Sequence, residues 1–587
     1  MNAPKLVRPR SAPKEAADGF VYPRFPYRKP PEFEGARNRY PVVIVGGGMV
    51  GLTAAADLGN RGINCVLLDD NDTVASGSRA ISQARRSFQI WDRVGAAKPM
   101  TAKGIQWTHA RQLYRDKVVN DHELHPEKGH KYPPMTLLPQ YYVENYLVER
   151  CAALGHVDLR WKNSVRGVRQ VEDHVELEVE TPDGKYTLLA DWVIAADGVA
   201  STVRKCLGLP FEGRKIEDRF VIVDVKVDAP FPPGRSFWFR QNFHSGSSTL
   251  FLRQPDGVCR VDFNIGPEAD AEEELKPENV EAKLRAMFGV GVNFDMKWIS
   301  LYTVEVRRLD KFRHGRVLFA GDSAHQLSPF SGGRGGNSGI EDVDNLGWKL
   351  ERVIRGQSPE SLLDSYDAER IGVADENMRF SLRASEFITP SSALSAAFQE
   401  AALTLSVGMD FARAYLNSGR LSMPARYTGS PLIVSVDDGA TASSVAPGCA
   451  VADAAAVDPQ GNRVFLAETL GQRFCLLLSS AADLSAAHSV ATRARDAGID
   501  VDVVLIDGQG GRAVNDGVTR TLVDAEGLVA ERYGLGTFST YLFRPDQRVA
   551  GRWRLFDSVS VEASLRLACG LGANDTRAAN AKMEVFK

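Results

Sequence analysis

The clearest hydrophobic patterns along the chain are short, continuous apolar runs that end in glycine or in an acidic residue. The first run covers residues 42–45 and is followed by glycines and by a helix-like segment at 49–58. A second run covers 64–68. Uninterrupted apolar runs of this length are typical of parallel strands that are buried on both faces of a sheet. The succession of strand, helix and strand therefore predicts a βαβ unit.

Two later runs have the same design. The strand expected at 191–196 ends in Asp197-Gly198, and the strand expected at 317–320 ends in Gly321-Asp322. Ligands of open α/β sheets bind at the carboxyl ends of the strands. We therefore expect these glycines and acids to meet at one edge of the sheet.

The segment 220–264 lies between these strands and has a different pattern. Its residues alternate between apolar and polar, aromatic side chains are frequent, and Pro-Gly and Asp-Gly turns separate the runs. This pattern predicts an antiparallel sheet, inserted between two halves of the nucleotide-binding domain. Beyond a stretch rich in Gly, Pro and Ser at 418–437, strand-like runs alternate with helical segments again, which indicates a further α/β domain.

The sequence thus predicts an α/β protein of several domains. A Rossmann-like domain carries an inserted antiparallel-sheet domain that binds substrate, and a C-terminal α/β domain follows. The expected boundaries are a Pro-rich extension at 1–40, the discontinuous nucleotide-binding domain at 41–215 and 305–395, the sheet domain at 216–304 with parts of 100–135, a helical linker at 396–430 and the C-terminal domain at 431–587.

Composition narrows the classes of partner. The 587 residues carry a formal net charge of -3, so no overall field favours nucleic acid or a membrane surface. The longest apolar runs are strand-sized, and residues 1–40 lack the apolar core of a secretory signal. Seven cysteines without a CxxC pair suit a reducing cytoplasm, and no HExxH pairing of histidines indicates a metal site. We expect a cytoplasmic protein without a metal centre.

A dinucleotide fingerprint follows the first strand. In Gly46-x-Gly48-x-x-Gly51, the glycines permit a tight turn, close approach of a pyrophosphate and close packing of the helix. Asp69 ends the second strand 18 residues after Gly51, where its carboxylate can accept ribose hydroxyls. A chance glycine-rich turn is the alternative, but strand, spacing and acid together favour nucleotide binding.

A second glycine-rich site lies far downstream, and it indicates which nucleotide binds. Asp322 can accept hydroxyl groups of a ribityl chain, and the loop 331–337 contains four glycines and opens a helix. By itself this loop is also compatible with a flexible surface segment. A pyrophosphate site combined with a second acidic, glycine-rich site is what a long flavin dinucleotide requires, so the sequence predicts FAD.

These motifs, together with Gly77–Ala80, Gln140, 197–204 and 321–346, resemble the single-component (group A) FAD-dependent aromatic hydroxylases, a family of flavoprotein monooxygenases. The resemblance covers roughly residues 40–390. Its last motif is similar to the 3-(3-hydroxyphenyl)propionate hydroxylase-like branch. The C-terminal part resembles the thioredoxin-like domain of phenol hydroxylase-like members, where the absence of CxxC points to a structural or oligomer-forming role rather than thiol chemistry.

The resemblance implies an NAD(P)H- and O2-dependent monooxygenase that hydroxylates a small phenolic or aryl-acid ring through a C4a-hydroperoxyflavin, in aromatic catabolism. NADH or NADPH would be a transient co-substrate. The resemblance is also compatible with a homodimer or a higher homo-oligomer. Two alternatives stay open. One is a flavoenzyme of the same fold that performs Baeyer–Villiger oxidation, halogenation or reduction, and the other is a flavin-binding scaffold without catalysis.

The resemblance also assigns cofactor contacts, residue by residue. Arg204 is expected to order the 197–204 loop by pairing with nearby acids. The expected FAD contacts are Gly46, Gly48, Met49, Val50, Gly51, Asp69, Asp70, Ser78, Arg79, Gln140, Val165, Asp197, Gly198, Asp322, Pro329, Gly335, Gly336 and Asn337.

Residues that contact the substrate are harder to assign. The chemistry takes place on the flavin, so no catalytic side chain is required, although His244 and Tyr302 could assist deprotonation of a phenol. For both, an ordinary structural role is the alternative. On the inserted sheet the candidates are Trp238, Arg240, Arg253, Asp262 and Asn264. Which of them face the substrate depends on strand register, because a slip of one residue turns every side chain to the other face.

Overall fold

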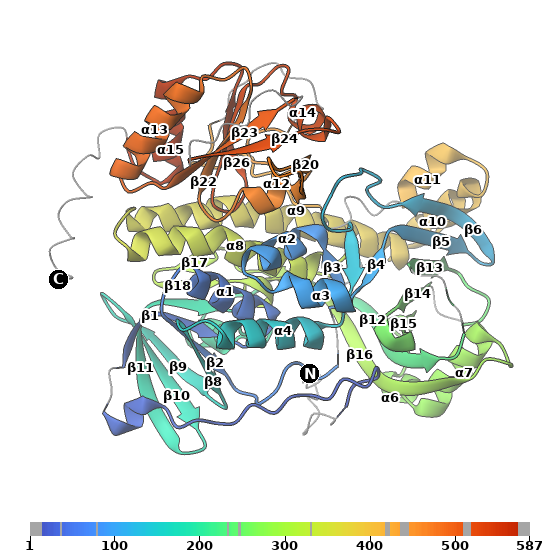
Figure 1. Ribbon diagram of the computed structural model, residues 1–587. Coiled ribbons are helices and arrows are strands. Elements are labelled where there is room, and N and C mark those ends of the chain that lie inside the picture. The colour runs from blue at the N-terminus through green and yellow to red at the C-terminus, as the bar shows by residue number, and fades with distance from the viewer. Residues whose placement is uncertain are drawn as a thin grey trace.

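The structure is a computed structural model that describes residues 15–35, 38–77, 80–229, 231, 234–244, 248–328, 332–416, 423–434, 445–508 and 518–572. Three bodies are visible in Figure 1: a mixed sheet with helices α1 (Met49–Asn60) and α4 (Gln140–Ala152), a second sheet beside it, and a C-terminal domain above both. Helices α8 (Arg334–Ile354) and α9 (Asp364–Ile388) run between the C-terminal domain and the first sheet.

The first sheet has parallel strands at its centre, in the order β18-β11-β1-β2-β8. Val42, Val43 and Ile44 of β1 are completely buried, as the apolar run predicts. Helix α1 packs against both α4 and α8. The strands of this sheet are β1 (Arg39–Val45), β2 (Cys65–Asp69), β8 (Val157–Trp161), β9 (Ser164–Gln170), β10 (Val175–Thr181), β11 (Gly184–Ala195), β17 (Arg313–His314) and β18 (Val317–Phe319).

The N-terminal segment lies along this domain. Tyr22 is buried and its hydroxyl accepts a hydrogen bond from the Gly77 amide over 2.9 Å. Phe25 stacks on Trp161 with 4.4 Å between ring centroids. The segment includes the short helix η1 (Pro31–Glu34) and is therefore packed onto the folded body as far as it is described.

The second sheet has the order β19-β16-β12-β15-β14-β13-β5-β6 and is antiparallel except between β13 and β5. The two strands at one end of this sheet, β5 and β6, precede the first domain's strand β11 in the sequence. The strands are β5 (His109–Tyr114), β6 (Lys117–Glu123), β12 (Glu212–Val227), β13 (Arg235–Phe239), β14 (Ser248–Arg253), β15 (Val258–Asn264), β16 (Phe294–Arg308) and β19 (His325–Gln326). A small sheet of β3 (Ser82–Ala84), β7 (Met135–Leu137) and β4 (Ile105–Trp107) lies between the two large ones.

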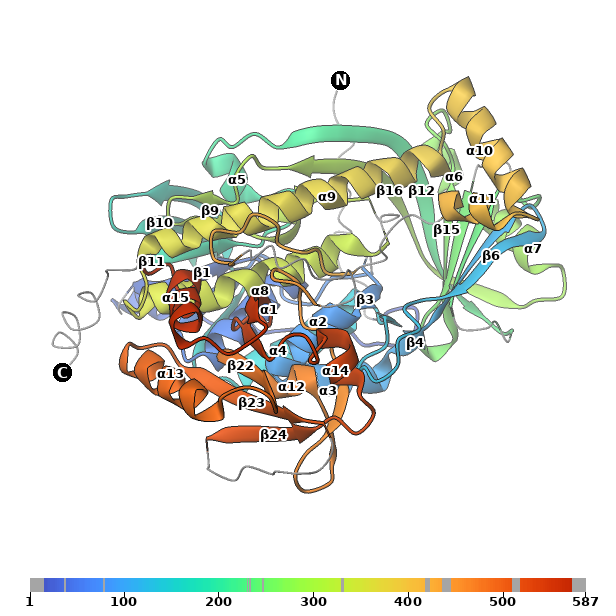
Figure 2. The same ribbon diagram turned by 90° about the horizontal axis from the view of Figure 1, so that it is seen from above.

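Strand register gives the second sheet two distinct faces. Val261 and Phe263 pack with Val280 and Leu284 of α7 (Pro277–Phe288), which follows the short α6 (Ala271–Glu274). Asp262 lies between them and points to the other face, because successive side chains of a strand alternate. Figure 2 shows α9 running from the first sheet towards this second sheet, with α10 (Ala393–Ser406) and α11 (Asp410–Leu416) at its far end.

The C-terminal domain is a seven-stranded sheet in the order β21-β20-β24-β23-β22-β25-β26. Trp348 of α8 contacts Phe474 of this domain with 5.8 Å between ring centroids. Its elements are β20 (Ala455–Val457), β21 (Arg463–Phe465), α12 (Leu466–Thr469), β22 (Phe474–Ser479), α13 (Leu484–Asp496), β23 (Val501–Asp507), β24 (Thr519–Val523), α14 (Leu528–Tyr533), β25 (Thr540–Phe543), β26 (Val549–Trp553) and α15 (Ser558–Ala568). The predicted α/β fold class, with its inserted sheet and additional C-terminal domain, is confirmed.

Candidate functional site

The fingerprint glycines form a tight β1–α1 turn packed on β11. Gly46 has φ +108°, and a Cβ there would lie 2.5 Å from the carbonyl oxygen of Ala196. A Cβ on Gly51 would lie 2.0 Å from the Gly46 carbonyl oxygen. Gly48 differs, because its only neighbour within 4 Å of a Cβ is a Glu144 carboxylate oxygen at 3.7 Å. Gly48 also caps α1 without a side-chain hydrogen bond, so the first turn of the helix offers backbone amides to an anion beside the Glu144 carboxyl.

Two carboxylates flank this turn. Asp69 accepts hydrogen bonds from the Gly47 amide over 2.6 Å and from the Asn71 amide over 2.8 Å. Asp70, beside it, is exposed and accepts a hydrogen bond from the Asn71 side chain. Asp69 is thus fixed at the carboxyl end of β2, where a ribose is expected.

The second carboxylate, Glu144, was not predicted from the sequence. It accepts hydrogen bonds from the Ala75 amide and from Gln140 Nε2, each over 2.7 Å. Burial raises the pKa of Glu144 to about 7, a net value that includes a small upward contribution from Asp69 and a downward one from the hydrogen bonds. Glu144 lies one helical turn after Gln140, but α4 also contains the exposed Glu149, and nothing in the sequence separates the two glutamates.

The downstream site is built around Gly321, which has φ +65° and begins the turn η3 (Gly321–Ser323). Its amide donates a hydrogen bond to Asp342 over 3.0 Å, and His325 Nε2 lies 2.7 Å from the same carboxylate oxygen. Burial alone would raise the pKa of Asp342, but His325 and Arg370 beside it hold that pKa well below its usual range. Asp342 thereby fixes the turn that exposes Asp322.

The glycine-rich loop leads directly into α8, whose N-cap is Gly333 with φ +71° and no side-chain hydrogen bond. A Cβ on Gly336 would lie 2.0 Å from Met49 Cε, so the first turns of α8 and α1 are in contact. A Cβ on Gly335 would meet nothing within 4 Å. The two helix N-termini therefore converge, and Gly335 borders open space.

Asn337 has its side chain occupied by protein groups. Its Oδ1 accepts hydrogen bonds from the Ala84 amide over 2.9 Å and from Ser87 Oγ over 2.6 Å. Its Nδ2 donates to the Ser82 carbonyl oxygen over 2.9 Å. Asn337 thus holds the start of α8 against β3 and α2 (Arg85–Arg93). Its side chain positions the loop.

The loop after β11 is tied to the Gly321 turn. Asp197 Oδ2 accepts a hydrogen bond from the Val203 amide over 3.1 Å, while its buried Oδ1 has no partner among the described residues. Arg204 donates to the Ser323 carbonyl oxygen over 3.0 Å and to the Val199 carbonyl oxygen over 2.5 Å. The hydrogen-bond partners of Arg204 are therefore carbonyl oxygens, in contrast to the acids expected from the sequence.

The remaining residues that were predicted to contact the cofactor lie in different surroundings, some buried and some beside open space. Val50 packs against Gly321 and Gly339, since a Cβ on either glycine would lie within 3.0 Å of its Cγ2. Val165 is buried in β9 opposite Val179. Gly198 has φ +73° and borders open space. Ser78, Arg79 and Pro329 lie outside the described residues.

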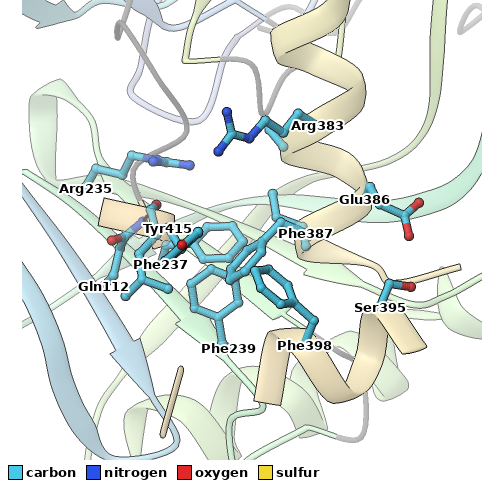
Figure 3. A pocket seen from close by; sticks show the side chains of 13 residues that line it. Gln112, Arg235, Phe237, Phe239, Arg383, Glu386, Phe387, Ser395, Phe398 and Tyr415 are labelled. Carbon is cyan, nitrogen blue, oxygen red and sulfur yellow. Dashed lines mark hydrogen bonds between the residues drawn. The ribbon is translucent and has the colours of Figure 1, made fainter. Parts of the chain in front are cut away.

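A cavity of about 280 Å³ lies between the second sheet and helices α9–α11. Figure 3 shows five aromatic side chains around it, Phe237, Phe239, Phe387, Phe398 and Tyr415, with Arg235 and Arg383 at one side. Ser385, in the α9 segment that lines the cavity, donates a hydrogen bond to Ser328 Oγ over 3.3 Å. Ser328 lies three residues before the predicted glycine-rich loop at 331–337, so the cavity wall contacts the segment that leads to this loop.

Of the predicted substrate residues, two share the face of the sheet that lines the cavity. Asp262 is directly opposite Leu250, which is opposite Phe237, and residues paired in this way point to the same side. Burial raises the pKa of Asp262 to about 7, and its Oδ1 has no partner among the described residues. Asn264 lies on the same face, and its Nδ2 donates to Thr389 Oγ1 over 3.1 Å.

Trp238 and Arg253 lie on the opposite face, in contrast to the sequence-based expectation. Trp238 packs with Phe243 in the cluster around α7, and Arg253 donates to the Phe231 carbonyl oxygen over 2.7 Å. Each follows or precedes a cavity-side residue by one position, which reverses its direction. Arg240 lies beyond the end of β13 and pairs with Glu400 over 3.1 Å.

The two candidates for phenol deprotonation lie on opposite faces of the second sheet. His244 Nε2 lies 3.0 Å from the Asn264 carbonyl oxygen, and its ring packs edge-on against Phe263, which belongs to the α7 face. Burial lowers the pKa of His244. Tyr302 is opposite Phe220 and packs with the apolar cluster that contains Phe237. Only Tyr302 therefore lies on the cavity side.

The family of FAD binding domains matches residues 39–381, more than half of the chain. The chain belongs to this family. The predicted resemblance to single-component flavoprotein monooxygenases is thereby confirmed: the protein is an FAD-dependent monooxygenase of the aromatic-hydroxylase type. Three features fit FAD: helix N-termini without side-chain caps, open space beside Gly335, and an Asp197 Oδ1 that has no partner among the described residues. The α1 turn, Asp69 and Asp322 would hold the diphosphate and ribityl groups.

Relatives extend the match beyond residue 381, over most of the chain. The 6-methylpretetramide 4-monooxygenase of Streptomyces rimosus is 28% identical over 562 residues, 92% of this chain and 94% of that protein. A 3-(3-hydroxy-phenyl)propionate/3-hydroxycinnamic acid hydroxylase of Mycolicibacterium smegmatis is 30% identical over 364 residues, 61% of this chain and 63% of that protein. The anhydrotetracycline hydroxylase OxyS of Streptomyces rimosus superposes with a TM-score of 0.68 at 25% identity, over 91% of this chain and 100% of that one.

The flavin-dependent monooxygenase PieE, solved with FAD and substrate, has a TM-score of 0.76 at 23% identity, over 90% of this chain and 98% of that one, and shares the fold.

No helix in the described ranges has the length and apolar character needed to cross a membrane. Among the same residues, no group of three or more His, Cys, Asp or Glu side chains is placed to hold a metal ion.

Proposed function

We propose that this flavoprotein hydroxylates a small phenolic or aryl-acid ring with NADH or NADPH as reductant and O2 as the oxygen source, in aromatic catabolism. The observation that carries the proposal is the aromatic-lined cavity whose α9 wall contacts the segment that leads to the glycine-rich loop. When bound, FAD supplies the redox chemistry, accepting electrons from the nicotinamide and activating O2. The protein supplies binding, orientation and exclusion of water.

The described side chains suit these tasks. Phe237, Phe239 and Phe387 offer faces and edges for an aromatic ring, and the cavity volume of about 280 Å³ suits a small molecule. Tyr302 is the candidate on this side of the sheet for a hydrogen bond to a phenolic oxygen. Asp197-Gly198 and the Gly321 turn would bind the cofactor from two sides.

The test measures oxidation of NADH and of NADPH by the FAD-loaded enzyme with a series of phenols and hydroxyaryl acids. We expect a subset of these rings to accelerate oxidation and to gain one oxygen atom, which carries the label when 18O2 is used. If no ring both accelerates oxidation and becomes labelled, aromatic hydroxylation is excluded. Product structures separate hydroxylation from ring-oxygen insertion or halogenation.

A second candidate is hydroxylation of a fused-ring aromatic polyketide. It is favoured by the 6-methylpretetramide 4-monooxygenase of Streptomyces rimosus, because that match includes the C-terminal domain. Parallel assays with one-ring phenols and with fused-ring phenols discriminate between the candidates by their ratio of kcat/KM. A fused-ring preference would replace the catabolic assignment with a biosynthetic one.

A further inference from the structure

Two arginines border the cavity without a carboxylate partner. Arg235 on β13 is half-buried, and its guanidinium lies over the Phe237 ring at 5.3 Å from the centroid. Arg383 on α9 is exposed. Within the described part of the chain, neither guanidinium forms a hydrogen bond or an ion pair. In Figure 3 both groups lie at the same side of the cavity and extend towards one another above the aromatic rings.

Two other arginines of the second sheet are paired with acids, in contrast to Arg235. Arg260 holds Asp224 over 2.8 Å, and Arg240 holds Glu400 over 3.1 Å. The nearest acid of the cavity wall, Glu386, accepts hydrogen bonds from the Ser391 amide over 3.1 Å and from Ser391 Oγ over 3.0 Å. Its carboxylate points away from the cavity in Figure 3. Glu386 therefore does not neutralise Arg383.

Asp262 is the acid closest to Arg235 in the register of the sheet. It lies two strands away on the same face and interacts with Arg235 only through space. Because burial raises the pKa of Asp262 to about 7, its carboxyl group is largely protonated below neutral pH. Gln112, the other polar group of this wall, is engaged with the Leu416 carbonyl oxygen over 2.8 Å. The positive charge of Arg235 thus stays available to a ligand.

Burial of an unpaired guanidinium costs free energy, which the contact of Arg235 with the Phe237 ring offsets only in part and which a bound anion would offset further. The planar fork of arginine matches a carboxylate in a two-point contact. We propose that the cavity binds a planar aromatic ring bearing a carboxylate, and that Arg235 and Arg383 hold this carboxylate while the aromatic side chains hold the ring. The inference rests on the proposed function and narrows its substrate to hydroxyaryl carboxylic acids.

The two arginines have unequal roles because they differ in exposure. A charge-assisted hydrogen bond to half-buried Arg235 is weakly screened, so its removal should weaken acid binding about ten- to hundredfold. Exposed Arg383 attracts the acid mainly through solvent, so its removal should cost about fivefold or less and the effect should shrink at high salt.

The experiment is calorimetric titration of the FAD-loaded enzyme, without nicotinamide, with 6-hydroxy-2-naphthoate and with 6-hydroxy-2-naphthamide. These probes share a ring and differ in charge. Wild type should prefer the acid by at least about tenfold, Arg235→Gln should lower this preference to about fivefold or less, and Arg383→Gln should reduce it by about fivefold or less. Arg379→Gln is the matched control, because Arg379 is exposed on α9 one turn before Arg383 and does not line the cavity.

Equal affinity for acid and amide in wild type, failure of the acid to bind, or a preserved acid preference in Arg235→Gln would each overturn the inference. Thermal melting and FAD content establish that the variants are folded. If Arg235→Gln does not fold, Arg235→Lys takes its place. It keeps the charge but loses the two-point contact, so an unreduced preference in Arg235→Lys also overturns the inference.

Calorimetry measures binding and the oxidation assay measures catalysis, so the carboxylate site and the proposed function can fail independently. If acids bind with the expected preference and no ring gains oxygen, the proposed function fails while the carboxylate site stands. If rings are hydroxylated but acid and amide bind alike, the proposed function stands and the carboxylate site fails.

Discussion

Arg544 of the C-terminal domain donates hydrogen bonds to both carboxylate oxygens of Glu369 in α9, and neither side chain is exposed to solvent. Lys349 of α8 binds the same carboxylate over 2.7 Å, and Asp546 pairs with Arg544 from the other side. The buried network joins the C-terminal domain to the two helices that carry the glycine-rich loop and the cavity wall. The domain is therefore part of the scaffold of the active site.

Replacing Arg544 should disrupt this scaffold. Arg544→Met leaves Glu369 and Asp546 buried with an incomplete set of partners, so we expect a loss of about 3–5 kcal/mol in the free energy of unfolding and release of FAD at lower denaturant concentration. Urea unfolding followed by flavin fluorescence measures both. The exposed pair Arg493–Glu562 is the control, and Arg493→Gln should cost at most about 1 kcal/mol. Equal effects of the two variants would contradict the scaffold role.

Two glycines of α8 should separate cofactor binding from stability. A Cβ on Gly335 meets no protein atom within 4 Å, so Gly335→Ala should leave the apo-protein as stable as wild type, or about 1 kcal/mol more stable, while weakening FAD binding. A Cβ on Gly339 would lie 2.7 Å from Val50 Cγ2 and 2.9 Å from Gly321 Cα, so Gly339→Ala should lose about 1–3 kcal/mol in stability. Apo-protein melting and FAD titration test the pair. Unchanged FAD affinity in Gly335→Ala would argue against a cofactor at this position.

The affinity for FAD should depend on pH through Glu144. The groups around its carboxyl are Gln140, the amides of Ala75 and Met49, and Asp69, and burial raises its pKa to about 7. Below that pH Glu144 is neutral beside the helix N-terminus. Above it, a second negative charge faces the anionic diphosphate, so FAD affinity should fall about tenfold as pH rises from 6 to 8 if the coupling amounts to about one pKa unit. Fluorescence titration of apo-protein measures this, and Glu144→Gln should remove the pH dependence. A pH profile that Glu144→Gln leaves unaltered would refute this origin.

Binding of aryl acids should have its own pH dependence, set by Asp262. Its carboxyl is faced by Arg260 on its own strand, by Asp224 on β12 and by Arg235 on β13, and burial raises its pKa to about 7. As pH rises through 7 the group becomes ionised and competes with the ligand for Arg235. The affinity for 6-hydroxy-2-naphthoate should therefore fall severalfold between pH 6 and 8, whereas Asp262→Asn should bind with constant affinity. Calorimetry at several pH values tests this, and the uncharged amide serves as the reference ligand.

The cofactor half of the site was largely readable from the chain. Glycine is required at Gly46, Gly51 and Gly321 by local geometry, because a tight turn or a close contact leaves no room for a side chain. Glu144 escaped prediction because a single glutamate in a helix carries no signal until the helix is packed against the fingerprint turn. Asn337 was predicted at the cofactor loop, but its partners Ser82, Ala84 and Ser87 come from a segment some 250 residues earlier.

The substrate half depended on register and on contacts between distant segments. Trp238 and Phe237 are adjacent, yet Trp238 packs in the cluster around α7 and Phe237 lines the cavity. The alternation of side chains along a strand shows that the two lie on opposite faces, but it does not show which face lines the cavity. Arg235 and Arg383 are about 150 residues apart in the sequence. They lie at the same side of the cavity because α9 packs beside the inserted sheet.

The sequence by itself determined the fold class and the cofactor, because strand periodicity and glycine geometry are local properties of short segments, and its motifs indicated the family by resemblance. Tertiary structure alone decided which side chains form the cavity and which arginines have no partner among the residues that the structure describes. These properties depend on which faces of remote elements come together, and on the burial that sets the charge of groups such as Asp262.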